Sequence, residues 1–165
     1  MNKTLAVRII SAILLLLLMA VIFGFSAQNG SESSAESSSV TENLCRGLYP
    51  KFKEKTPAQQ KKIVDTLHNP VRKTAHFLLY FTLGTCAFFT FVTYKSIPYG
   101  MRFLIPFLLC ALYAASDEIH QYFVGGRGAM VSDVLLDSAA ALTAVTLFWI
   151  LVNNRRKRAD GGQGT

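Results

Sequence analysis

The chain has few cysteines and lacks the motifs of the common soluble enzyme classes. Of its three cysteines, Cys86 and Cys110 fall in apolar stretches and Cys45 in a polar one, so no intrachain disulfide framework is expected. We find no nucleophile elbow, no Walker phosphate loop, no HExxH zinc motif and no internal repeat. These absences leave no standard catalytic mechanism as a starting point.

The charge of the chain does not indicate a nucleic-acid-binding protein. The formal net charge is +7, but the basic residues cluster at the chain ends and in one loop, as they do beside membrane spans. The 165 residues are enough for one domain, and 51% of them are hydrophobic and bunched into runs. This composition predicts one all-α, polytopic membrane domain over residues 1–165 and no nucleic-acid partner.

Four apolar segments are predicted to span the membrane as helices. Each has about the 20 residues that cross roughly 30 Å of hydrocarbon. The first contains an uncharged run from Ile9 to Phe25, whereas the last two reach this length only with their acidic residues included. The four segments are residues 5–25, 74–94, 103–123 and 131–152.

The first segment could be a cleavable signal peptide or a retained anchor. Lys3 and Arg8 would suit the basic region of a signal peptide. The apolar run is longer than usual for one, and cleavage after Ala27 would place the bulky Phe25 at a position that needs a small side chain. We expect a retained anchor.

The basic residues also predict the orientation. Lys3 and Arg8, the turn with Lys95 and Arg102, and the basic tail 153–165 all fall on one side of an even number of spans. The positive-inside rule makes that side cytoplasmic. We therefore expect a multi-pass protein of the cell membrane with both termini cytoplasmic and the loop 26–73 outside.

The loop 26–73 begins with a serine-rich stretch, Ser26–Ser39, that has few apolar residues and is typical of a flexible linker. Val40, Leu44 and Leu48 follow at helical spacing. A second helix is predicted to start at Thr56-Pro57 and to stop at Asn69-Pro70. These short helices would either lie on the membrane surface or cover the polar clusters as a lid.

Three polar clusters fall at the same end of the predicted spans. They are RKTAH (72–76), SDEIHQ (116–121), and GGRG (125–128) followed by Asp133 and Asp137. Ionisable groups at membrane depth are expensive and by default indicate a site. An internal network that only holds three helices together is the alternative. We favour a functional site.

Spacing places several of these residues on shared helix faces. His76, Tyr80 and Gly84 are four apart, as are Asp117 and Gln121, and Asp133 and Asp137. Gly84 would allow a neighbouring helix to approach closely. The histidines and carboxylates could ligate a divalent metal or act as acid–base groups, so no cofactor is assigned. The GGRG segment could form an anion-binding concavity with Arg127 at its rim, or a plain turn.

Two stretches, RKTAHFLLYFTLG and SDEIHQYFVGGRGAMVSDVLLD, closely resemble the signatures of the VanZ-like family. The resemblance is strong over Arg72–Asp137 and departs from the family pattern at Ser138-Ala139, where glycine is common. It implies a small bacterial integral membrane protein, related to a founding member associated with low-level resistance to teicoplanin-type glycopeptides. The matched family positions are Arg72, Lys73, His76, Tyr80, Asp117, Glu118, His120, Gln121, Arg127, Asp133 and Asp137.

The leading hypothesis is an outward-facing polar pocket that handles an amphiphilic cell-envelope molecule, with a membrane lipid or lipid-like amphiphile as partner. The reactive or catalytic core would be His76, Asp117, Glu118 and His120. The remaining matched positions would bind substrate, with Arg72, Lys73 and Arg127 on an anionic head group. A membrane-embedded hydrolase or transferase and a non-catalytic scaffold are the alternatives. The oligomeric state stays open.

Overall fold

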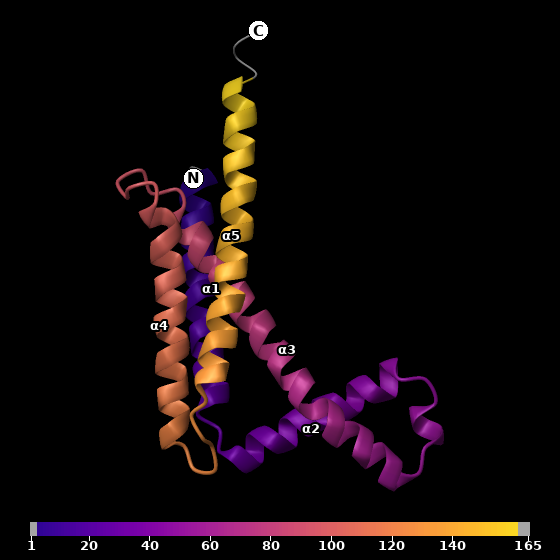
Figure 1. Cartoon of the computed structure of the whole chain (residues 1–165). Coiled ribbons are helices and arrows are strands. Elements are labelled where there is room, and N and C mark those ends of the chain that lie inside the picture. The colour runs from indigo at the N-terminus through magenta and orange to yellow at the C-terminus, as the bar shows by residue number, and fades with distance from the viewer. Residues whose placement is uncertain (1–2, 162–165) are drawn as a thin grey trace.

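The computed structural model describes residues 3–161, and the regular secondary structure of this part of the chain is entirely helical (Figure 1). Four of the helices are long and apolar enough to cross a membrane, namely α1, α3, α4 and residues Val131–Lys157 of α5. This confirms the predicted all-α class with four spans. The elements are α1 (Lys3–Ser26), α2 (Gly30–Leu48), the short 3-10 helix η1 (Phe52–Glu54), α3 (Pro57–Phe91), α4 (Met101–Phe123) and α5 (Val131–Gly161).

The helices form a bundle with an arm at one end (Figure 1). Helices α1, α4 and α5 run alongside one another, and the second half of α3 crosses them and packs against all three. The first half of α3 leaves the bundle sideways, and α2 packs against it. Both ends of the chain lie at the opposite end of the bundle from this arm.

Small residues bring α3 and α5 close together. A Cβ atom added at Gly84 would lie 2.9 Å from the Cα and the carbonyl oxygen of Ala141, so no larger residue fits without a shift. Ala140, Ala141 and Ala144 on α5 are fully buried. Such contacts are the usual means of helix association in lipid. The close approach predicted at Gly84 is confirmed.

Helix α1 is bound into the bundle by polar as well as apolar contacts. The hydroxyl of Thr90 donates to Ser11 Oγ at 3.1 Å, and the hydroxyl of Tyr113 donates to the Met19 carbonyl at 2.6 Å. Leu15 and Ile22 are buried against the other helices. Most other apolar side chains of α1 are exposed, as expected for a helix with one face toward lipid.

The prediction of a flexible serine-rich linker is wrong, because most of that stretch belongs to α2. The helix begins with a capping box: Asn29 Oδ1 accepts from the Glu32 N–H at 2.9 Å, and the Glu32 carboxylate accepts from the Asn29 N–H at 3.4 Å. Farther along, Thr41 and Cys45 are buried where α2 packs on the first half of α3. Cap and packing together offset the weak helix preference of serine.

The predicted stop at Asn69-Pro70 is also wrong, because α3 runs unbroken through Pro70. The capping box at Thr56 and Gln59 that begins the helix is present as predicted. Pro70 cannot donate to the carbonyl of Thr66, but both residues are exposed, so water can satisfy this carbonyl. The second span thus continues the loop helix and ends at Phe91, before the predicted residue 94, while α5 extends into the predicted tail as far as Gly161.

Candidate functional site

The three polar clusters meet at the end of the bundle from which the arm leaves. Two pairs of ionisable side chains join α3 to α5: Arg72 Nη2 lies 3.5 Å from Asp133 Oδ2, and His76 Nδ1 lies 3.6 Å from Asp137 Oδ2, a contact that is an ion pair when His76 is protonated. Arg72 and His76 are four residues apart on α3, and Asp133 and Asp137 are four residues apart on α5. The two pairs therefore lie one helical turn from each other. The outer pair is partly exposed, whereas Asp137 is buried.

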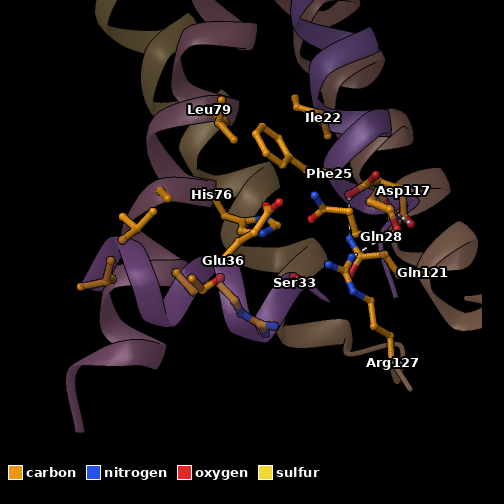
Figure 2. A pocket seen from close by; sticks show the side chains of 16 residues that line it. Ile22, Phe25, Gln28, Ser33, Glu36, His76, Leu79, Asp117, Gln121 and Arg127 are labelled. Atoms are coloured by element: carbon orange, nitrogen blue, oxygen red, sulfur yellow. Dashed lines mark hydrogen bonds between the residues drawn. The ribbon is translucent and has the colours of Figure 1, made fainter. Parts of the chain in front are cut away.

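A cavity of about 200 Å³ opens beside these pairs, between α1, α2, α3, α4 and the loop that carries Arg127 (Figure 2). Figure 2 shows Ile22, Phe25 and Leu79 at one side of it and Gln28, Gln121 and Arg127 at the other. The cavity therefore has an apolar part and a polar part. Its lining residues are Ile22, Phe25, Ser26, Gln28, Ser33, Glu36, Ser37, Val40, Val71, Arg72, Ala75, His76, Leu79, Asp117, Gln121 and Arg127.

Asp117 supplies a buried carboxylate to the cavity wall. Its Oδ2 accepts a hydrogen bond from the Gln121 side-chain amide at 3.0 Å, one helical turn away. Its Oδ1 has no hydrogen-bond partner among the described residues, and neither has Asp137 Oδ1. The hydroxyl of Ser26 donates to the Asp117 carbonyl at 3.5 Å, which ties the end of α1 to α4.

Arg127 contributes a half-buried guanidinium that no carboxylate of residues 3–161 pairs within ion-pair distance. Its Nη1 donates to the Ser26 carbonyl at 3.2 Å. Burial lowers the pKa of Arg127 from its ordinary value, and the nearby positive charge of Arg72 lowers this pKa further. Two guanidinium groups therefore approach the same cavity closely enough to repel each other.

The glycines before Arg127 hold the start of α2. The Gly30 N–H donates to the Gly125 carbonyl at 3.0 Å. A Cβ atom at Gly30 would lie only 2.1 Å from the Gly126 carbonyl oxygen, and Gly126 itself has a φ of 79°, in the left-handed region that favours glycine. The loop thus fixes α2 over the cavity and carries Arg127 into its wall.

The predicted reactive core divides into two parts. His76 and Asp117 line the cavity, but Glu118 and His120 do not. Glu118 Oε1 accepts from the Met130 N–H at 2.5 Å and so fixes the chain just before α5. The His120 ring stacks on Phe23 of α1, with centroids 4.7 Å apart.

The predicted substrate-binding residues also separate. Gln121 lines the cavity together with Arg72 and Arg127, whereas Asp133 and Asp137 lie behind as partners of Arg72 and His76. Tyr80 is fully buried, with no partner for its hydroxyl in the described part of the chain. Lys73 is exposed and does not line the cavity. Within residues 3–161, no three His, Cys, Asp or Glu side chains are placed to hold a metal ion together.

One wall of the cavity was missed by sequence reasoning. Helix α2 contributes Ser33, Glu36, Ser37 and Val40, which are spaced as one helix face. The available signal was the Asn29–Glu32 capping box, which marks a helix start directly before these residues. The low-complexity composition concealed it.

Comparison with known proteins agrees with this architecture. A sequence model of the VanZ/LLP1 family matches residues 11–152, a range that includes the spans α3 and α4, most of the first and last spans, and the whole polar site. No curated protein and no solved structure gives a significant match. With most of its length covered by this family model, the chain belongs to the VanZ/LLP1 family.

Proposed function

We propose that this VanZ-family membrane protein binds an amphiphilic cell-envelope molecule, with the anionic head group in the polar part of the cavity. The observation that carries this proposal is one cavity with two arginines in its polar wall and Ile22, Phe25 and Leu79 in its apolar wall. Such a mixed lining is suited to a molecule that is itself polar at one end and apolar at the other.

The two arginines favour an anionic head group. A guanidinium presents a planar fork of donors that fits a phosphate or carboxylate. Among residues 3–161, the Arg127 guanidinium has a single hydrogen-bond partner, the Ser26 carbonyl. Arg72 and Arg127 repel each other, so an anion between them would be favourable. His76 and Gln121 add further hydrogen-bonding groups to the same wall.

The head-group preference can be tested with amphiphiles of equal chain length. We would reconstitute the protein in phosphatidylcholine nanodiscs and photolabel it with a diazirine-bearing dodecyl phosphate. Unlabelled dodecyl phosphate should compete, whereas dodecyltrimethylammonium and dodecanol should not. Equal competition by all three would exclude an anionic head-group site.

A pair of charge-removing variants controls this experiment. Arg127→Gln should weaken dodecyl phosphate binding by about tenfold or more, because a hydrogen bond to a charged group contributes about 1.5–3 kcal/mol. Lys73→Gln removes the same charge from an exposed residue outside the cavity and should have no effect. Equal behaviour of the two variants would refute a role for Arg127.

The same variants test an influence on glycopeptides. Cells that produce the wild-type chain should differ in teicoplanin susceptibility from cells without it if the bound molecule belongs to the cell envelope. Arg127→Gln should abolish this difference and Lys73→Gln should preserve it, at equal membrane abundance measured by immunoblotting. A difference that survives in Arg127→Gln would separate susceptibility from the cavity.

A second candidate function, a membrane-embedded hydrolase or transferase acting on a lipid-linked substrate, is favoured by the His76–Asp137 pair. Asp137 faces Nδ1 of His76, an arrangement that orients an imidazole for acid–base chemistry, and His76 lines the cavity. Phosphate release from a long-chain alkyl diphosphate by the wild type, but not by His76→Gln that still binds dodecyl phosphate, would support an enzyme. Binding without release by either protein would favour the binding function.

A further inference from the structure

A second hollow adjoins the cavity along the arm. It has a volume of about 240 Å³ and is lined by Thr41, Leu44, Cys45, Leu48, Tyr49, Leu67 and Val71, which we call the arm groove. Val71 lines both the cavity and the arm groove. The cavity therefore adjoins, at Val71, a hollow whose lining is almost wholly apolar.

The side chains that α2 presents to the two hollows change from mostly polar to mostly apolar along the helix. Its first turns present Ser33, Glu36 and Ser37 to the cavity, and its later turns present Leu44 and Leu48 to the arm groove. The spacing of all these residues keeps them on one helix face. The same face of α2 is thus polar beside the cavity and apolar beside the groove.

Helix α3 changes in the same direction on the other side. Arg72 and His76 face the cavity, Val71 stands at the junction, and Leu67 faces the arm groove. Both helices therefore carry acidic or basic side chains on the cavity side, namely Glu36, Arg72 and His76, and none in the arm groove, which leads away from the bundle. Figure 1 shows that the two helices leave the bundle together, so the groove points away from the spans.

The arm groove leaves apolar side chains uncovered. Leu48 is 79% exposed and Leu44 is 42% exposed, while Thr41 and Cys45 form a buried floor between the helices. Apolar area that is left in water costs about 25 cal/mol per Å². A hollow between two adjacent helices suits a narrow occupant better than the flat surface of a bilayer.

We propose that the arm groove holds the hydrocarbon chain of the amphiphile whose head group lies in the cavity. This inference rests on the proposed function, since it assigns a place to the other end of the same ligand. The two hollows adjoin at Val71, and the acidic and basic side chains with which α2 and α3 line them lie on the cavity side alone, which matches the polarity of the ligand from head to chain.

The position of the chain end can be mapped directly. A dodecyl phosphate with a diazirine at its last carbon should label α2 around Leu44–Leu48 and α3 around Leu67, and unlabelled dodecyl phosphate should compete with this labelling. Competed labelling at Ile22 or Leu79 with none in the arm would place the chain end among the spans and refute the arm groove. Arm labelling without competition would show that the arm merely lies on the bilayer, which also refutes the inference.

Two matched variants test the groove wall. Leu48→Glu changes a residue of α2 that is 79% exposed, and Asn43→Glu adds the same charge at an exposed α2 residue that lines neither hollow, so neither should disturb folding. Leu48→Glu should weaken dodecyl phosphate binding by about tenfold, equivalent to about 1.4 kcal/mol, whereas Asn43→Glu should not. Equal binding by both variants would refute the groove.

Butyl phosphate separates this inference from the proposed function, because its chain is too short to reach far beyond the head-group cavity. Arg127→Gln should weaken both butyl and dodecyl phosphate, while Leu48→Glu should weaken dodecyl phosphate alone. Failure of Arg127→Gln to weaken either ligand would overturn the proposed function. A normal response to Arg127→Gln combined with no effect of Leu48→Glu would overturn the arm groove alone.

Discussion

Two acidic residues of α5 form similar ion pairs in different surroundings. Asp133 pairs with the half-exposed Arg72 near the surface, whereas the Asp137 carboxylate is buried and faces His76. Exposed pairs contribute little to stability because water and salt screen them, but a buried group that loses its partner is costly. The two pairs therefore differ in their contribution although each joins α3 to α5.

This contrast predicts unequal effects of two identical substitutions. Asp133→Asn should lower the free energy of unfolding by at most about 1 kcal/mol. Asp137→Asn should lower it by about 2–3 kcal/mol, at the low end for a broken buried pair because His76 can become neutral. Unfolding by a denaturing detergent in mixed micelles measures both values. A larger loss in Asp133→Asn would contradict this assignment of the pairs.

Glu118 accepts a hydrogen bond from the Met130 N–H, so we predict that Glu118 stabilises the start of α5 and takes no part in ligand binding or a reaction. Glu118→Ala should destabilise the protein by about 1 kcal/mol, as loss of a cap does, and Glu118→Gln should recover most of this because its amide oxygen still accepts. Mixed-micelle unfolding and dodecyl phosphate labelling together check the prediction. Normal stability of Glu118→Gln combined with loss of labelling would show instead that Glu118 takes part in ligand binding.

At the scale of single residues, the sequence predicted which groups gather but not which of them face the cavity. The spacing by four placed Asp133 and Asp137 on one helix face, and the structure pairs them with Arg72 and His76 of α3. The rotation of each helix about its axis depends on its neighbours. For this reason Asp117 lines the cavity while its neighbour Glu118 faces the loop before α5.

At the scale of elements, the spans were predictable, whereas the arm was predicted only in part, through the start of α3 at Thr56 and the helical spacing of Val40, Leu44 and Leu48. Long apolar runs determine a span by themselves, since lipid satisfies no backbone group. Helix α2 depends instead on its cap at Asn29 and on packing against α3, which composition alone does not show. Pro70 was read as a stop because the exposure that allows water to replace its missing hydrogen bond is known only from the fold.

Two glycines of α2 provide a matched test of how this helix is held. Gly30→Ala would drive a Cβ atom into the Gly126 carbonyl and should detach the start of α2, with faster hydrogen exchange across α2 and weaker dodecyl phosphate labelling. Gly47→Ala meets nothing within 4 Å and should slow exchange, since alanine favours a helix by about 1 kcal/mol over glycine. Equal exchange in both variants would show that the glycine contact does not hold α2.

At the scale of the whole molecule, the cavity and the arm lie at one end of the bundle and both chain ends lie at the other. The side of the membrane that the cavity faces therefore follows from the side of the termini. The basic turn and tail predict cytoplasmic termini by the positive-inside rule, although the arm itself is also rich in lysine. The rule is weaker for long loops, which is why the charge of the arm does not decide the matter.

Single cysteines at the two ends of the bundle test this orientation. Asn43 on α2 and Ser96 in the turn after α3 are both exposed, while the native cysteines are buried and should react slowly. A membrane-impermeant maleimide should label Asn43→Cys in intact cells and Ser96→Cys only after permeabilisation. The reverse pattern would place the cavity at the cytoplasmic leaflet. It would then exclude an outer-leaflet ligand while leaving the head-group and arm-groove assignments to their own tests.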